Sequence, residues 1–192
     1  ACSDHARRLQ ALLASLETEA EPAAAATYAA LAPVVASAQG LASYYSNVHR
    51  DWVWGDAENS AALEILRDLA GQAPLGALLV AGSGAGRLAY DVHQHLQPQM
   101  TFAADINPLL QIVARRVSGG ASVPLWEFPI APRALEHCAL ERTLRAPEPA
   151  RGGLHFVMAD VMRAPWSPWM ASLAASSTAP VNASARAGTS RA

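Results

Sequence analysis

A glycine-rich loop contains the residues whose type and spacing are best suited to chemistry. It consists of Gly82, Ser83, Gly84, Ala85 and Gly86. The loop follows an apolar run, Leu75 to Ala81, and precedes a segment with helical spacing that begins at Arg87. Glycine permits positive φ and lets a ligand approach the backbone closely, while the first turn of the next helix presents unpaired N–H groups. This arrangement predicts a cradle for a nucleotide-type cofactor.

Two further apolar runs each end at an acid. Met100 to Ala104 is followed by Asp105, and Leu154 to Ala159 is followed by Asp160. Open parallel sheets bind ligands at the carboxyl ends of their strands, where an acid can accept hydrogen bonds from both hydroxyls of a ribose. We therefore predict that Asp105 binds the ribose. An isolated aspartate after a strand is also a common cap or turn residue, and this alternative remains open for Asp160.

The glycine spacing separates two classes of cofactor. The dinucleotide fingerprint is GxGxxG, in which the loop and the helix N-terminus receive a pyrophosphate. This chain has GxGxG, and Arg87 occupies the position of the last glycine in that fingerprint. The GxGxG form resembles the first motif of class I S-adenosylmethionine (SAM)-dependent methyltransferases, whose cofactor contains no phosphate. Ala159-Asp160-Val161 likewise resembles the motif of that class that contacts the adenine.

Two segments together resemble the carnosine N-methyltransferase (N2227-like) family. They are Asn47 to Trp52 and Leu79 to Ala89. Ordinary methyltransferases have an acid two residues before the first glycine. This chain has Val80 there, and that family also lacks the acid. The family shares Gly-Arg-Leu-Ala after the loop and a long insertion between the ribose acid and the adenine acid. The resemblance covers roughly residues 44 to 165.

This resemblance implies a role for individual residues. Arg50, with Asn47 one turn earlier, would clamp the methionine carboxylate, a bidentate task suited to a guanidinium. Asn47 stands where the family tends to have glutamine. Gly82 and Gly84 would line the methionine. Asp105, which replaces the family's glutamate, would bind the ribose. Asp160 and Val161 would contact the adenine. The predicted cofactor-binding set is Asn47, Arg50, Gly82, Ser83, Gly84, Gly86, Arg87, Asp105, Asp160 and Val161.

Several of these residues have a structural interpretation as well. Arg50 and Asp51 can be a solvated pair on a helix, and core packing is the favoured interpretation for the nearby aromatic residues Tyr44, Tyr45, Trp52 and Trp54. Trp126-Glu127-Phe128 can form a wall of a substrate site or can pack in the core. The histidines lack ligand-spaced partners, so we expect no metal. The catalytic residues stay unidentified.

Helices are expected to position these residues. Before the first strand we expect an amphipathic first helix carrying Leu9, Leu12, Leu13 and Leu16, an alanine-rich helix from Ala23 to Ala38 that is kinked at Pro33, a short helix running into a loop over 41–54, and a helix capped by Asn59 or Ser60 and ended by Gly71. After the glycine loop we expect a helix carrying Leu88, Val92 and Leu96, and then a helix opened by Asn107-Pro108 with Leu109, Ile112, Val113 and Val117 buried. A further short helix is expected around Ala134 to Leu144.

The expected fold is α/β, a Rossmann-like SAM-methyltransferase sheet of three parallel strands in the order 3-2-1. An N-terminal helical region is expected at 1–71, the partial SAM-binding domain at 72–170 with an insertion at 118–153, and a disordered tail at 171–192. A complete sheet of this class contains more strands, so we expect a truncated form. Its first strand would then be an exposed edge that permits self-association.

Composition excludes some partners. The chain has 192 residues, a formal net charge of −2 and 16% charged residues, so it lacks the basic field needed for nonspecific binding to nucleic acid or an anionic membrane. Cys2 and Cys138 form no disulfide framework, and no apolar stretch is long enough for a membrane span, which favours the cytoplasm. The expected partner is a small-molecule or peptide methyl acceptor, by resemblance a histidine-containing peptide. A noncatalytic SAM-binding module and an NAD-binding oxidoreductase fragment are the alternatives.

Overall fold

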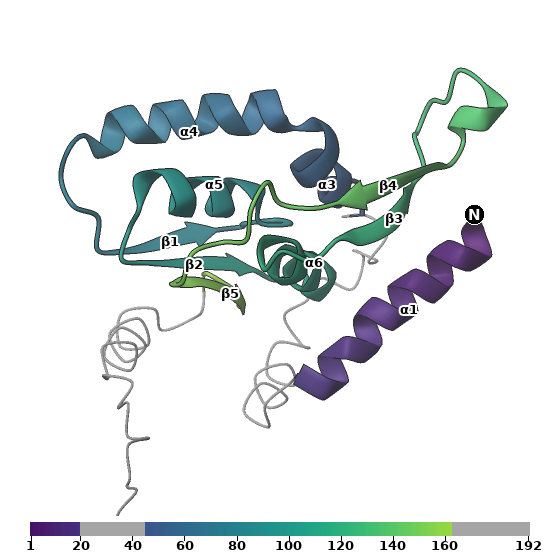
Figure 1. Ribbon diagram of the computed structural model, residues 1–192, viewed down its shortest axis with the longest axis horizontal. Helices are drawn as coiled ribbons and strands as arrows, with labels where there is room; N and C mark the ends of the chain where they lie inside the picture. The colour runs from purple at the N-terminus through teal and green to yellow at the C-terminus, as the bar shows by residue number, and fades with distance from the viewer. Residues whose placement is uncertain (20–44, 163–192) are drawn as a thin grey trace, which may run out of the picture.

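A three-stranded parallel sheet is the centre of the fold in the computed structural model, which describes residues 1–19 and 45–162. Its strands are β1 (Ala77–Ala81), β2 (Met100–Asp105) and β5 (Leu154–Met158), and β2 lies between the other two (Figure 1). Both pairings are parallel, with Leu79 opposite Phe102 and Phe102 opposite His155. The predicted α/β class with parallel apolar strands is confirmed.

Helices connect the strands as the apolar spacing predicted. α5 (Arg87–Leu96) joins β1 to β2, and α6 (Pro108–Ser118) follows β2. The Asn107 side chain caps α6, because its Oδ1 accepts hydrogen bonds from the amides of Leu109 (3.0 Å) and Leu110 (3.3 Å). Proline suits the first helical position, because the N–H that it lacks would have no acceptor within the helix there. The predicted cap is thus confirmed, as is the buried stripe of Leu109, Ile112, Val113 and Val117.

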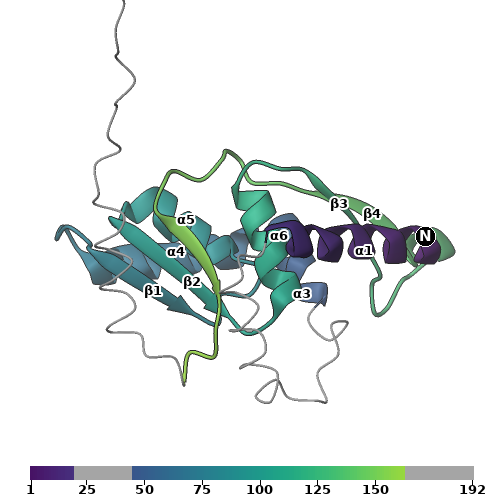
Figure 2. The ribbon, with the colours of Figure 1, turned by 90° about the horizontal axis from the view of Figure 1, so that it is seen from below.

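α6 is the central helix of the hydrophobic core. It packs against α1 (Cys2–Glu19), α3 (Tyr45–His49), β2, β3 and β5. Figure 2 shows α1 running alongside α6 and the hairpin that contains β3. Leu12 of α1 is 6% exposed, which confirms that the first helix is amphipathic. Because α6 starts at the carboxyl end of β2, this packing joins the N-terminal helices to the edge of the sheet where a ligand site was predicted.

The segment before the sheet is more helical than expected. α3 continues without a loop into a π-helix, η2 (Arg50–Trp54), and α4 (Asp56–Ala70) follows Gly55. A Cβ on Gly55 would lie 2.2 Å from the Arg50 carbonyl oxygen, so the chain turns there only because this residue is glycine. The predicted N-caps of α4, Asn59 and Ser60, lie four and five residues after the observed N-cap, Gly55, whereas the predicted end at Gly71 is confirmed. Asp56 and Glu58 favour the earlier start, since acids stabilise a first turn.

The predicted helix around Ala134 to Leu144 is also wrong. The structure has an antiparallel hairpin of β3 (Val123–Glu127) and β4 (Leu140–Leu144), with a short 3-10 turn, η3 (Leu135–His137), between them. In β4 the exposed residues alternate with the inward-facing ones, as a period of two requires. The hairpin lies within the predicted insertion at 118–153.

Some predictions fall on residues that the structure does not describe. The alanine-rich helix at 23–38 and the tail at 171–192 are outside the described residues. Within the described ranges, no helix is both long enough and apolar enough to cross a membrane.

β1 is an edge strand of the sheet within the described ranges, since it pairs there only with β2. Its first residue, Ala77, is exposed. We expect self-association through this edge, and we expect Ala77→Lys to weaken it by roughly tenfold, about 1.4 kcal/mol, because a lysine on an edge strand must lose hydration when another strand pairs there. Sedimentation equilibrium measures the effect, with Ala77→Ser as the uncharged control. A wild-type chain that is monomeric at all concentrations would contradict this prediction.

Candidate functional site

The glycine loop lies at the carboxyl end of β1, beside the end of β2. Gly82, Gly84 and Gly86 have φ values of +63°, +60° and +88°, which side-chain-bearing residues rarely adopt. The amide of Ser83 donates to the Ala104 carbonyl at 3.0 Å and so fastens the loop to β2. The predicted strand, glycine loop and helix unit is present.

Asp105 fastens the loop a second time. Its Oδ2 accepts a hydrogen bond from the Gly84 amide at 2.9 Å, and its Oδ1 accepts one from the Asn107 amide at 2.8 Å. Each carboxylate oxygen has two lone pairs, so both oxygens can accept one further hydrogen bond. Asp105 therefore positions the loop and keeps the capacity to bind a ribose. That contact stays a prediction.

Gln111 is a site residue that the sequence interpretation missed. Its Nε2 donates to Ser83 Oγ at 3.0 Å and approaches the Gly84 carbonyl at 3.4 Å. Its Oε1 is buried and has no hydrogen-bond partner among the described residues. A glutamine within the apolar stripe of α6 was the available signal, because buried polar side chains need partners. Ser83 thus contacts the helix behind the loop.

Arg50, the predicted methionine clamp, lies beside the loop. Its Nε and Nη2 donate to Asp51 Oδ1 at 3.0 and 2.8 Å. A Cβ added to Gly84 would lie 3.3 Å from Asp51 Oδ2 and 3.7 Å from Arg50 Nη2, so both side chains face Gly84. The Asp51 side chain is only 5% exposed, against 39% for Arg50. The interpretation as a solvated helix pair is therefore wrong for Asp51.

The Asp51 carboxylate lies beside the backbone amides at the start of α5. The backbone amides of Ala85 and Arg87 lie near enough to this carboxylate to favour its charged form. Burial raises the pKa of Asp51 above its ordinary value, and Arg50 together with these amides acts in the opposite direction. The positive end of the α5 dipole is thus partly neutralised by a residue of the chain itself. Sequence reasoning did not predict this contact.

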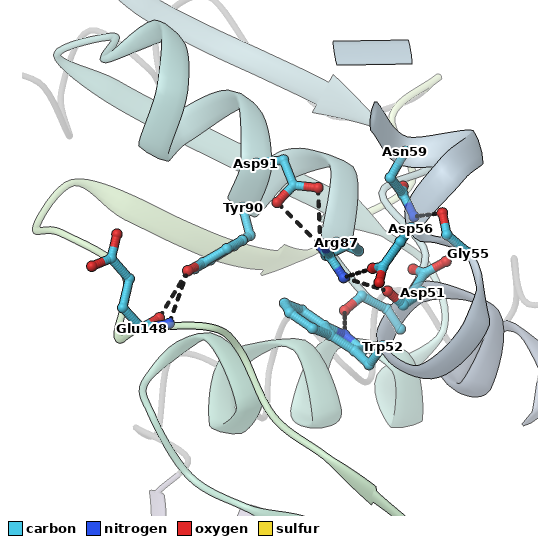
Figure 3. Close-up of polar contacts among 10 residues, drawn as sticks. Asp51, Trp52, Gly55, Asp56, Asn59, Arg87, Tyr90, Asp91 and Glu148 are labelled. Carbon is cyan, nitrogen blue, oxygen red and sulfur yellow. Dashed lines mark hydrogen bonds and ion pairs between the residues drawn. The ribbon is translucent and has the colours of Figure 1, made fainter. Parts of the chain in front are cut away.

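Trp52 and Arg87 also connect η2 with the glycine loop and the start of α5 (Figure 3). Trp52 Nε1 donates to the Ala85 carbonyl at 2.7 Å, and the residue is 6% exposed, which confirms its predicted core packing. The Arg87 guanidinium lies 5.6 Å from the Trp52 ring, donates from Nε to Asp91 at 2.9 Å, and donates from Nη1 to Asp56 at 2.8 Å. Arg87 therefore joins α4, η2 and α5. Its role as a cofactor ligand stays a prediction.

Gly86 faces the interior of the fold. A Cβ there would lie 2.6 Å from Phe156 Cε1 and 2.8 Å from the Ala114 Cβ. Close packing of the loop against β5 and α6 thus explains why this residue is glycine, independently of any ligand.

The remaining predicted residues lie around the same edge. The Ala159 amide donates to the Asp105 carbonyl at 3.1 Å, which places the end of β5 beside the end of β2. Asp160 Oδ1 accepts from the Met162 amide at 2.9 Å, so Asp160 is a turn residue, as the alternative interpretation held. Asp160 and Val161 are half-buried. Asn47 is half-buried on α3, one turn before Arg50, outside the contacts that hold the loop.

Comparison of the chain with protein-family models and with curated proteins gives no match. The resemblance to the carnosine N-methyltransferase family therefore stays a prediction. Among residues 1–19 and 45–162, no group of three or more His, Cys, Asp or Glu is placed to hold a metal ion.

Proposed function

We propose that this chain binds SAM at the glycine loop and belongs to a SAM-dependent methyltransferase. The resemblance suggests N-methylation of a small molecule or a histidine-containing peptide. The observation that carries the proposal is the position of the Arg50–Asp51 pair, with Arg50 beside Gly84 and Asp51 on the amides that open α5.

The position of Asp51 argues against a dinucleotide cofactor. In a dinucleotide site, the pyrophosphate accepts hydrogen bonds from the amides at the helix N-terminus. Here the Asp51 carboxylate already lies beside two backbone amides of this region, those of Ala85 and Arg87. Two negative charges 4 Å apart repel by about 4 kcal/mol at an effective dielectric constant of 20. SAM has no phosphate, so it avoids this repulsion.

Arg50 is suited to the carboxylate of the methionine part. Asp51 holds one edge of the guanidinium through Nε and Nη2, and among the described residues nothing accepts a hydrogen bond from Nη1. The Arg50 side chain is 39% exposed, so a ligand can reach part of it. A carboxylate can then bind the free edge in a bidentate manner, while Gly84 lets it approach. Asp51 acts as a positioning residue for Arg50.

Methyl transfer requires mainly that the reactants are held in line and desolvated. Bound SAM supplies an electrophilic methyl group. Arg50 would hold the methionine carboxylate, the free lone pairs of Asp105 would accept the ribose hydroxyls, and Asp160 with Val161 would contact the adenine. A dedicated base is optional for this chemistry, and no residue of the chain is assigned that role.

Calorimetric titration tests the proposal. We expect S-adenosylhomocysteine to bind and NAD to give no heat. Arg50→Met should weaken binding of S-adenosylhomocysteine by roughly 10- to 100-fold, because hydrogen bonds to charged groups contribute about 1.5–3 kcal/mol. Arg67→Met is the matched control, since Arg67 is exposed on α4.

The outcomes separate the alternatives. No heat with S-adenosylhomocysteine, or equal affinity in Arg50→Met and wild type, would sink the proposed site. Heat with NAD alone would favour an oxidoreductase fragment. Binding of S-adenosylhomocysteine without transfer of a labelled methyl group to histidine-containing dipeptides would favour a noncatalytic SAM-binding module.

A further inference from the structure

A cavity of about 790 Å³ lies between α1, α3, the start of α6 and the end of β3. We call it the α1–α3 pocket. Its lining includes His5 of α1, Tyr45 and His49 of α3, Leu109 of α6, and Glu127 and Phe128 at the end of β3. Its volume is in the range of small-molecule sites, about 300–1,000 Å³.

One wall of the pocket is a row of four rings. Phe128 and His5 have centroids 5.2 Å apart, His5 and Tyr45 4.8 Å, and Tyr45 and His49 5.0 Å. Every pair is edge-to-face, with interplanar angles of 75–76°. Aromatic rings favour such arrangements and also favour offset contacts with a further ring. The wall is therefore suited to a flat apolar molecule.

His49 is the unpartnered polar group of this pocket. It is 1% exposed, and neither of its ring nitrogens has a hydrogen-bond partner among the described residues. Burial lowers the pKa of His49 below its ordinary value, and the Glu127 carboxylate and the Trp126 carbonyl, which already accepts the Tyr45 hydroxyl, only partly offset this fall. The neutral ring then has one donor and one acceptor. A buried polar group without a hydrogen bond is unfavourable, and a ligand that supplies the missing partner removes that cost.

The other polar groups indicate that the ligand is uncharged. Glu127 accepts hydrogen bonds from Trp54 Nε1 at 3.1 Å and from Arg142 Nε at 2.8 Å, so its charge is already paired. Burial also lowers the pKa of His5, which favours its neutral form. No unpaired charge on the described lining therefore calls for an ionic partner.

We propose that the α1–α3 pocket binds a small, neutral, planar aromatic molecule with one hydrogen-bond donor, of the phenol or indole type, whose donor pairs with a ring nitrogen of His49. The row of rings contacts the flat apolar face, and His49 fixes the orientation. This site is independent of the SAM proposal, because it uses none of the residues assigned to the cofactor.

The test uses two probes that differ only in the donor, 1-naphthol and 1-methoxynaphthalene, titrated into the whole chain without SAM or S-adenosylhomocysteine. We expect saturable binding of 1-naphthol and at least tenfold weaker binding of its methyl ether. His49→Phe should reduce the affinity for 1-naphthol to that for the ether. His137→Phe is the control, since His137 is exposed on η3.

An absence of saturable binding to the wild-type chain would overturn the proposal and indicate that the chain's own residues fill the pocket. Equal affinities for the two probes would also overturn it, and this comparison needs no variant. Should His49→Phe fail to fold, the wild-type His49 ring proton signals replace it: we expect them to shift with 1-naphthol, and unchanged signals would contradict the role of His49. A negative result here leaves the titration with S-adenosylhomocysteine unaffected.

Discussion

Gly86→Ala is expected to lower the free energy of unfolding by roughly 2–5 kcal/mol. Two effects add. A side-chain-bearing residue at φ +88° costs about 1–2 kcal/mol, and the new methyl group would meet Phe156 at 2.6 Å and Ala114 at 2.8 Å, an overpacking that costs about 1–3 kcal/mol. Since domains are stable by only about 5–15 kcal/mol, much of the margin would be lost.

Gly82→Ala is the matched control for this substitution. Gly82 has φ +63°, and a Cβ there would have no atom within 4 Å, so only the conformational cost of about 1–2 kcal/mol applies. Urea unfolding followed by circular dichroism measures both variants. Equal losses would show that the contact of Gly86 with Phe156 and Ala114 does not determine the cost.

Asp51→Ala is expected to cost about 2–4 kcal/mol of stability and to abolish binding of S-adenosylhomocysteine, if the proposed site is correct. The substitution removes the carboxylate that lies beside the amides of Ala85 and Arg87, and with it the group that orients Arg50. Arg50 is more than one-third exposed, so water replaces part of its lost partner and limits the cost.

Asp51→Asn separates the hydrogen bonds from the charge, because it keeps an acceptor oxygen. It should cost less than Asp51→Ala. The native pKa of Asp51 is raised, so the native state holds this proton more tightly than the unfolded state does. The contribution of Asp51 to stability is therefore full below the unfolded pKa of about 3.9 and falls as the pH rises through the native pKa. Urea unfolding across that range should show wild type losing stability relative to Asp51→Asn, and a gain would contradict the burial of Asp51.

The parallel core was predictable because its signals are local. Each strand is a short apolar run with a boundary at glycine, proline or an acid, and the cap of α6 is written in adjacent residues, Asn107 and Pro108. The hairpin was not predictable in this way. Residues 134–144 include several good helix formers, and their strand conformation depends on pairing with Val123–Glu127, which a local pattern does not reveal.

The candidate site was predicted only in part for the same reason. The loop and Arg50 were found from their spacing and resemblance, but the contact of Asp51 with the loop joins segments more than thirty residues apart. Val48, Asp51 and Trp52 share the spacing of one helix face, and all three are buried, which was the available signal. Nor could spacing show that Gly86 is a packing glycine whereas Gly84 faces Arg50.

The glycine loop is fastened by the chain's own residues in β2, α6 and η2, and this affects how a ligand would arrive. Fixing a free backbone residue costs about 1–2 kcal/mol in entropy, and in this chain folding has already ordered these residues. A ligand entering the loop then loses mainly its own freedom of motion. Association should accordingly proceed in a single fast phase, without a slower rearrangement of the loop after encounter.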